Sequence, residues 1–287
     1  MKKKVISLLI CSLVVLNITG CGTSSKTTSS DTAKTTEDTS KDVKDTKSEN
    51  TPVKNEDDAL SKNEADYEFN KDSGIILKYT GKSTAVEIPS TIGGVKVVSI
   101  NTKTFMNNID LKRVVISEGI NRIGTQAFAQ CSSLTSVEIP NSVEYIESLA
   151  FSYCSGLKDI KIPSHLKDIG TGAFTESAIT SITIPNGIKD IPPDAFRRCF
   201  SLTSVNIPNS VTTIGKNAFS DCPITSIQLP EKLAYINQDA FSNCHKLTTL
   251  TIPNSVTRVE SGAFHGCENL TVHASNKIIE DVRSAMR

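Results

Sequence analysis

Tryptophan is absent from the 287 residues of this protein, and aromatic residues make up only 5% of them. Because binding hot spots favour Trp, Tyr and Arg, a tight site that stacks on a sugar or another small molecule is not expected. An excess of charge of one sign is missing too, since 31 Lys plus Arg balance 31 Asp plus Glu. With no basic stripe, the sequence argues against nucleic acid as a partner.

Catalytic and metal-binding motifs are also missing. There is no HExxH, no GxSxG, no glycine-rich phosphate loop and no Ser–His–Asp spacing. Cys244–His245 is the one Cys–His neighbour pair, and adjacent side chains in a turn usually point apart. The four histidines are scattered along the chain: His165, His245, His265 and His273. The sequence therefore predicts no catalytic residue, no metal site and no cofactor, and the protein is not expected to be an enzyme.

What the sequence does contain is a repeat, best seen in the segment 134–154, LTSVEIPNSVEYIESLAFSYC. The phenylalanine of this unit recurs at Phe105, Phe128, Phe151, Phe174, Phe196, Phe219, Phe241 and Phe264, in steps of 23, 23, 23, 22, 23, 22 and 23 residues. Its proline recurs at Pro140, Pro163, Pro185, Pro208, Pro230 and Pro253. A fixed period in this range is typical of a solenoid, in which each unit is one coil.

Within the unit, the spacing of Leu134, Val137 and Ile139 predicts a short strand with Val137 and Ile139 facing inward. Pro140 ends the strand because it has no N–H for a ladder. Val143 and Ile146 then return to the core, and the segment 149–151 suits a short helical turn on the opposite side. One coil buries too little apolar surface to offset its conformational entropy, so only the stacked array is expected to be stable.

The pattern LxxVxIPxxVxxIxxxAFxxC resembles the BspA-like leucine-rich repeat of bacterial surface proteins, and the match runs from about Val86 to Leu270. The resemblance implies a repeat solenoid with a parallel β-sheet on its concave face and irregular or short helical turns on its convex side. Some members of that family are adhesins, which makes binding of extracellular or host surface proteins the expected role.

The N-terminus has the features of a secretory signal. Lys2, Lys3 and Lys4 precede the apolar run 5–18, which is shorter than the roughly 20 residues that a membrane-spanning helix needs. The sequence Ile18-Thr19-Gly20-Cys21 resembles a bacterial lipobox, which implies a signal peptide over 1–20 and lipidation of Cys21. The alternative is an uncleaved N-terminal anchor. Either one would hold the protein at the extracellular face of the bacterial cell membrane.

A polar stretch follows, and residues 21–66 are interpreted as the lipidated cysteine and a disordered stalk. From Gly22 to Ala65 the chain has 7 Lys and 10 Asp plus Glu and almost no apolar residue. Such a segment buries too little surface to fold. Electrostatic binding is the alternative function, but mixed charge does not favour a selective patch.

The solenoid is expected over 67–275, with a hairpin cap at its N-terminal end. Residues 67–69 and 75–79 read as two strands joined by the turn 71–74, and Gly93-Gly94 marks a local bulge in the first unit. Residues 276–287 are predicted to form a C-terminal capping helix, with Ser275-Asn276 as the helix cap. Membrane binding is the alternative for this helix. Its apolar face comprises Ile278, Ile279, Val282 and Met286.

Six cysteines lie three residues after a repeat phenylalanine: Cys131, Cys154, Cys199, Cys222, Cys244 and Cys267. Zinc binding lacks the paired CxxC spacing. Disulfides between neighbouring coils are conceivable by distance, and an exported protein would normally pair its cysteines. Asn108 and Ser177 take the same position in two units, however, and this favours free structural thiols.

The outward positions of the predicted strands form the candidate binding surface. Its first part mixes charges and its later part is mostly hydroxyl and amide: Lys112, Arg113, Glu138, Lys158, Asp159, Lys161, Thr183, Asn206, Gln228 and Thr251. Such a surface is also what strand preference and cross-strand pairing produce on a wet face. As a functional surface, it would bind a protein, or a glycan, by weak multivalent contact. The alternative function is a non-catalytic envelope scaffold or spacer without a specific ligand.

Overall fold

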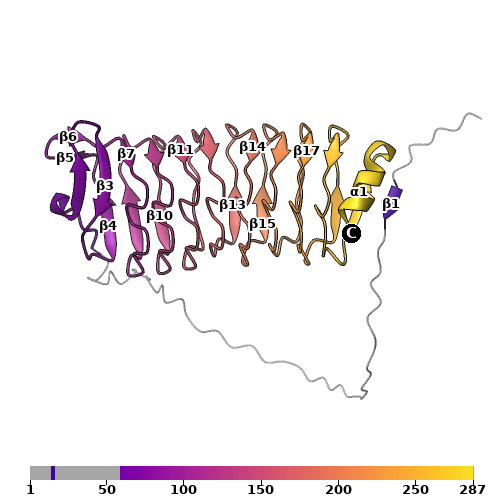
Figure 1. Ribbon diagram of the computed structural model, residues 1–287, viewed down its shortest axis with the longest axis horizontal. Helices are drawn as coiled ribbons and strands as arrows, with labels where there is room; N and C mark the ends of the chain where they lie inside the picture. The colour runs from indigo at the N-terminus through magenta and orange to yellow at the C-terminus, as the bar shows by residue number, and fades with distance from the viewer. Residues whose placement is uncertain (1–13, 17–58, 287) are drawn as a thin grey trace, which may run out of the picture.

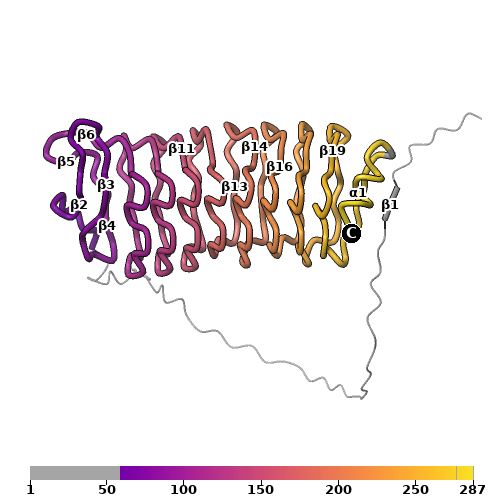
Figure 2. The backbone as a smooth tube through the Cα atoms, in the orientation of Figure 1, coloured from indigo at the N-terminus to yellow at the C-terminus, as the bar shows by residue number. Residues whose placement is uncertain are grey.

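The computed structural model describes residues 14–16 and 59–286. Coils stack side by side along one axis, with the N-terminal hairpin at one end and helix α1 at the other (Figures 1 and 2). The N-terminal elements are η2 (Glu64–Asp66), β2 (Tyr67–Asn70), β3 (Ile75–Tyr79), β5 (Thr91–Ile92) and β6 (Val95–Lys96). The C-terminal elements are η3 (Asn276–Ile278) and α1 (Ile279–Ala285).

Each coil contributes strands to two ladders. Ladder A contains the strand predicted from the sequence: β4 (Ala85–Ile88), β8 (Arg113–Ile116), β10 (Ser136–Glu138), β13 (Ser181–Thr183), β15 (Ser204–Asn206), β18 (Thr249–Thr251) and β20 (Thr271–Ala274). Ladder B contains β7 (Ser99–Ile100), β9 (Arg122–Ile123), β11 (Tyr145–Ile146), β12 (Asp168–Ile169), β14 (Asp190–Ile191), β16 (Thr213–Ile214), β17 (Tyr235–Ile236) and β19 (Arg258–Val259). Pairing between coils is parallel throughout both ladders.

A third set of bonds, the turn ladder, joins the coils at the repeat phenylalanines. In each junction the Phe N–H donates to the carbonyl of the alanine that precedes the next phenylalanine, as Phe128 does to Ala150 at 2.8 Å. The residues two before and two after Phe128, Gln126 and Gln130, donate in the same way to Ser148 and Ser152. The Phe-to-Ala bond recurs at all eight phenylalanines, so the turn ladder is continuous from Phe105 to the C-terminal helix.

The turn ladder requires an unusual backbone. The residues two before and two after every repeat phenylalanine have positive φ, between 53° and 72°. Only three of these sixteen are glycines, and the left-handed region is costly for other residues. The inter-coil bonds offset this cost. The predicted helical turn at 149–151 is therefore an irregular, hydrogen-bonded turn, because Leu149 has a φ of 58°.

The core is a column of stacked phenylalanines enclosed by apolar strand residues. Consecutive rings from Phe105 to Phe264 lie 4.9 to 5.9 Å apart between centroids and are nearly parallel. All eight rings are buried. Val137 is buried as predicted, while Ile139 is only partly buried against the core. The repeat phenylalanines therefore form the continuous apolar centre of the solenoid.

The N-terminal end of the stack is closed by a hairpin that extends ladder B. At the N-terminal end β2 and β3 form an antiparallel hairpin, and β3 pairs in parallel with β7. Gly93 and Gly94, both with positive φ, make the turn of the small β5–β6 hairpin at the predicted bulge.

At the C-terminal end the carbonyl of Ala285 accepts the N–H of Phe264 at 2.9 Å, as the alanine of a further coil would. Met286 packs against the core and follows Ala285 as Phe follows Ala in the repeat. Val282 is buried as predicted. Ser275 makes no side-chain capping bond, so that part of the helix prediction was wrong: the chain enters α1 through the 3-10 turn η3 instead.

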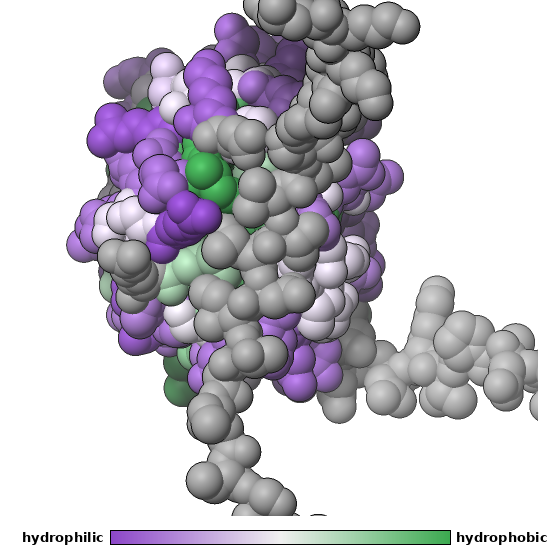
Figure 3. All heavy atoms as spheres, turned by 90° about the vertical axis from the view of Figure 1, so that its right-hand side faces the viewer, coloured by the Kyte–Doolittle hydropathy of each residue, from purple (hydrophilic) through white to green (hydrophobic). Residues whose placement is uncertain are grey.

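The outer edge of β20 pairs antiparallel with β1 (Val14–Leu16). Figure 3 shows this end of the molecule, with hydrophilic side chains around its rim. Cys21, most of the predicted signal peptide and most of the predicted stalk lie outside the described residues. If the chain is cleaved before Cys21, β1 is removed and the edge of β20 is exposed.

Candidate recognition surface

The outward residues of ladder A do not form one uniform surface. Near the N-terminal end, Arg113 and Glu138 pair with each other, with 2.7 Å between Nη2 and Oε1. These two predicted binding residues therefore neutralise each other on adjacent strands. Lys112 is exposed beside them, and its backbone carbonyl accepts the N–H of Thr135.

Several threonine side chains on this face donate hydrogen bonds to backbone carbonyls of the preceding coil. The hydroxyl of Thr135 donates to the Lys112 carbonyl at 3.0 Å, and Thr203 donates to the Thr180 carbonyl at 3.3 Å. Thr180 and Thr225 donate to the preceding coil in the same way. Their hydroxyl protons therefore stabilise the stack.

Both ladders are interrupted at the same junction, which we call the seam. It separates the coil of residues 157–169 from the coil of residues 179–191. Ladder A has no strand between β10 and β13, and ladder B does not pair β12 with β14. The turn ladder continues across the seam through Phe174.

The seam coincides with a shorter unit. Ile179 follows Phe174 by five residues, whereas Leu157 follows Phe151 by six. The chain therefore reaches ladder A one residue early, and the Thr180 N–H still donates to the Lys158 carbonyl across the seam. The second 22-residue step has the same short turn, and there Ser226 makes a single bridge to Ser204 and no strand pairs onward to β18.

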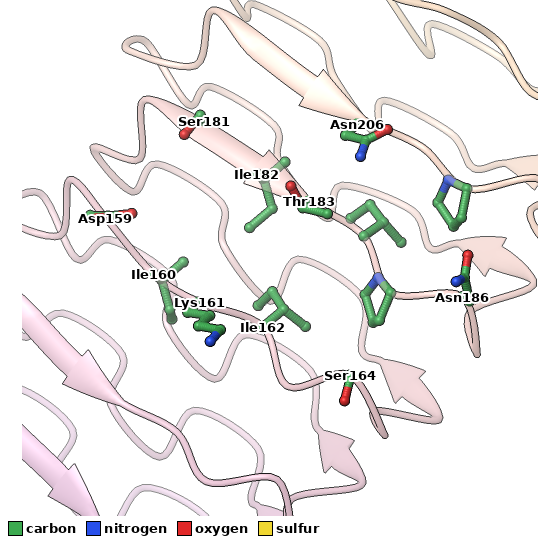
Figure 4. A pocket seen from close by; sticks show the side chains of 13 residues that line it. Asp159, Ile160, Lys161, Ile162, Ser164, Ser181, Ile182, Thr183, Asn186 and Asn206 are labelled. Carbon is green, nitrogen blue, oxygen red and sulfur yellow. The ribbon is translucent and has the colours of Figure 1, made fainter.

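A groove of about 850 Å³ lies over the seam on ladder A. It is lined by Asp159–Ile162, Ser164, Ser181–Asn186, Asn206 and Pro208, and Figure 4 shows how these side chains are arranged on neighbouring coils. The groove brings together four predicted binding residues: Asp159, Lys161, Thr183 and Asn206. Lys158 adjoins it in sequence, whereas Lys112, Arg113, Glu138, Gln228 and Thr251 do not line it.

The polar groups of the groove have few partners within the protein. Among the described residues, the side chains of Asp159, Lys161, Thr183 and Asn206 make no hydrogen bond or ion pair. The backbone N–H and C=O groups of 159–162 likewise make no intramolecular bond in the described part of the chain. Nearly all backbone groups in folded proteins are paired, so four consecutive residues without partners are an exception.

A second hollow of about 260 Å³ was missed by the sequence analysis. It lies between the turns of neighbouring coils and is lined by Phe200, Asp221, Pro223, Asn243, His245 and Lys246. Phe200 is 67% exposed, more than any other large apolar side chain in the described residues. The sequence signal was an aromatic residue at the position after the repeat cysteine or its equivalent, where other units have Ile, Ser, Ala, Pro, His or Glu.

The repeat cysteines are free and buried, as expected for structural thiols. Each thiol donates to the carbonyl of the phenylalanine one coil back, at 3.0 Å from Cys222 Sγ to Phe196 O. Ser177 Oγ lies 3.5 Å from Cys199 Sγ in the same column. Burial raises the pKa of Cys131 to about 12 and of Cys267 to about 11, and it raises the pKa of Cys154, Cys222 and Cys244 as well.

Metal chemistry finds no support in the described part of the chain, where no cluster of three His, Cys, Asp or Glu side chains could hold an ion. None of the described helices is long and apolar enough to span a bilayer. The absence of catalytic activity remains a prediction from the missing motifs.

Short parallel strands, buried phenylalanines and 22- to 23-residue coils define a repeat solenoid of the leucine-rich class. The family model for the BspA type leucine rich repeat region matches residues 76–202 and 189–285, in six copies. The chain therefore belongs to the BspA-type leucine-rich repeat family, as the sequence resemblance predicts. No curated protein matches the chain significantly.

Two solved structures have similar folds. A leucine-rich repeat protein from Bacteroides ovatus is 31% identical, with a TM-score of 0.62, over 71% of this chain and 61% of that protein. The chain thus spans about three fifths of that protein's length. The T. pallidum leucine rich repeat protein is also 31% identical, with a TM-score of 0.54, over 76% of this chain and 92% of its own.

Proposed function

We propose that this protein is a lipid-anchored recognition protein of the bacterial cell surface that binds extracellular or host surface proteins through ladder A. The observation that carries the proposal is the groove at the seam, where the polar side chains of Asp159, Lys161, Thr183 and Asn206 lack intramolecular partners among the described residues. Groups in this condition gain hydrogen bonds from a ligand without first breaking bonds of their own. Membership of the BspA-type family is compatible with such a role.

Location at the extracellular face rests on the lipobox-like sequence before Cys21 and on the polar stretch that follows it. Metabolic labelling with a radioactive fatty acid tests this part. Label is expected in the membrane fraction of cells that express the full chain, and a Cys21→Ser variant should lose both the label and the membrane association. Equal labelling of the two chains would refute lipidation at Cys21.

The binding function is tested with the chain from residue 21 onward, carrying Cys21→Ser, on an array of extracellular matrix and cell-surface proteins. Captured proteins are then measured by surface plasmon resonance against a Lys158→Glu/Lys161→Glu variant. Lys189→Glu/Lys216→Glu is the matched control, because these lysines are also exposed but lie outside the groove.

Weaker binding by the Lys158/Lys161 variant alone supports the proposal. Reduction by both variants would indicate a general charge effect. If no protein on the array binds, the alternative of an envelope scaffold without a specific ligand is favoured. Two observations agree with that alternative: the threonine hydroxyls that bond to backbone carbonyls, and the ion pair between Arg113 and Glu138.

A further inference from the structure

The two ends of ladder A are covered in different ways. At the N-terminal end, Ser61 bridges Val86 of β4, and the Ser61 N–H donates to the Ala85 carbonyl at 2.9 Å. At the C-terminal end, β20 pairs with β18 on one side, and α1 contacts β20 without occupying its outer edge. Among the described residues, that edge is paired only with β1, which lies within the predicted signal peptide (Figure 1). Removal of residues 1–20 would therefore leave β20 as an open sheet edge.

The hydrogen bonds of β20 show which of its backbone groups face this edge. The Thr271 N–H and the His273 carbonyl each bond to the backbone of the preceding coil, at 2.8 Å. Since successive residues of a strand direct their N–H and C=O groups to opposite sides, the groups of Val272 and Ala274 point away from β18. Without β1, two N–H donors and two C=O acceptors are therefore left unpaired at the end of ladder A.

β20 lacks the features that protect sheet edges from pairing with other chains, which are charged residues, prolines and bulges. The edge strand β2 of the N-terminal hairpin has two of them, the charged Glu68 and a bulge between Glu68 and Phe69. β20 has the sequence Thr-Val-His-Ala, without Lys, Asp, Glu or Pro, and its register with β1 and β18 is regular. An open β20 can therefore pair with a further strand.

The edge-facing groups of β20 are complementary to those of a second β20. Val272 and Ala274 are two residues apart, so a two-fold axis at His273 sets Val272 of each copy opposite Ala274 of the other. Both pairs are then of the hydrogen-bonded type with two bonds each, and all edge-facing groups of the two copies are paired. β1 occupies the same place in the same antiparallel sense, with Val14 opposite Ala274, so a strand in this orientation fits beside α1.

We propose that, once the signal peptide is removed, two copies of this protein join end to end through antiparallel pairing of their β20 strands. The two His273 side chains then face each other across the two-fold axis. The inference rests on the signal peptide of the proposed function and adds a partner, a second copy of this chain. Two-fold contacts of this kind are the commonest in soluble protein assemblies, and many copies on one cell surface raise the local concentration.

Sedimentation equilibrium of the chain from residue 21 onward, carrying Cys21→Ser, tests the dimer without depending on cleavage in cells. One strand pair buries less surface than a standard interface, so the Kd of the dimer is expected to lie roughly between 1 µM and 1 mM. A monomer at every concentration up to about 1 mM would overturn the inference.

Charge at the two-fold axis identifies the contact. The Cα atoms of a non-hydrogen-bonded antiparallel pair lie about 4.5 Å apart, so His273→Glu sets two carboxylates opposite each other and His273→Lys sets two ammonium groups there. Each variant alone is expected to dimerise at least about tenfold more weakly than the wild type. A mixture of the two is expected to form a heterodimer at least as tight as the wild-type dimer, because each Glu then faces a Lys.

Thr251→Glu and Thr251→Lys are the matched controls. Thr251 lies beside His273 in register on β18 and is exposed on the same face, but it is one strand away from the edge. In the dimer, the two copies of this residue are three strand spacings apart, about 14 Å, which exceeds the screening length at physiological salt. Both variants should therefore dimerise as the wild type does.

A dimer that the His273 variants do not weaken, or that the His273 and Thr251 variants weaken equally, forms through another contact and overturns the inference. A mixture of the His273 variants without recovery overturns it too. If the wild type stays monomeric and binds a protein of the array in a way that His273→Glu alone abolishes, the edge accepts a strand of another protein. The inference then fails and a recognition function stands. A dimer with the expected charge dependence, together with an array on which nothing binds, supports the inference and counts against the proposed binding function.

Discussion

Phe196 and Phe200 offer a direct test of the stacked core, because they are the same residue type in the same coil, four positions apart. Phe196 is fully buried, with its ring centroid 5.5 Å from Phe174 and 5.4 Å from Phe219. Phe200 is 67% exposed. Phe196→Ala removes a core ring, whereas Phe200→Ala removes a surface ring of identical size.

Truncation of a buried Phe to Ala costs about 3–5 kcal/mol. The two ring contacts of Phe196 contribute about 0.5–1.5 kcal/mol each beyond the buried area, which places Phe196→Ala in the upper part of that range. Phe200→Ala should stay within about 0.5 kcal/mol of the wild type.

Urea unfolding followed by circular dichroism measures both variants, and the urea concentration at the midpoint is compared at constant m. With m of about 3 kcal/mol/M, Phe196→Ala should lower the midpoint by about 1 M or more. A second, earlier transition is an acceptable form of this result, since coils interact only with their neighbours. Equal midpoints for the two variants would refute the ring column as the main apolar support.

Three further predictions concern the thiols and the C-terminal cap. Burial raises the pKa of five repeat cysteines, so these thiols lose their protons at lower pH in the unfolded chain than in the folded one. The free energy of unfolding is therefore unaffected below the unfolded thiol pKa, about 8.5. Above that pH it falls by up to about 1.4 kcal/mol per thiol and pH unit. Urea midpoints at pH 8 and pH 9.5 check this, and a constant midpoint would contradict the burial of the thiols. Cys222→Ala leaves the Phe196 carbonyl without its thiol donor and should cost about 1–3 kcal/mol, whereas Cys222→Ser retains a hydrogen-bond donor and should cost less. The reverse order in urea unfolding would argue against the S–H bond. Val282→Asp buries a charge under the last coil and should expose Phe264 to early amide exchange, while Ser284→Asp, on the exposed side of α1, should not; protection of the Phe264 amide in both variants would show that α1 is dispensable.

The sequence predicts the features that depend on side-chain spacing. The period of the phenylalanines predicts the coil, and the apolar spacing predicts the burial of Val137 and Ile146. The recurrence of Cys131 at equivalent positions predicts the buried thiols. Each of these follows from an apolar residue that recurs at a fixed distance and must find an interior.

Features that depend on backbone geometry were not predicted. The second strand of each coil is two residues long, as in Tyr145–Ile146, which is too short to show an alternating pattern. The positive φ values fall on Gln126, Leu149 and Tyr153 as well as on Asn, Asp and Gly in other units, so the residue types at these positions give no consistent local signal. The seam coincides with the missing residue before Ile179, but the second short unit keeps β16 paired with β17, so the spacing alone does not predict the interruption.

The C-terminal cap has a signal in the sequence besides its helical spacing. Ala285-Met286 follows Ala263-Phe264 by 22 residues and repeats the Ala-Phe pair with a different apolar side chain. The helical spacing of Ile279 and Val282 predicts the helix but not this continuation of the Ala-Phe period.

The carbonyl of Ala285 accepts the N–H of Phe264, just as the alanine carbonyl of the next coil accepts the phenylalanine N–H in every earlier coil. The terminal helix is thus interchangeable with one more turn of the winding, and it would close an array of any copy number equally well. Duplication or loss of a whole unit changes the reach of the molecule without requiring a new end, so length can vary freely in proteins built this way while the closure stays the same.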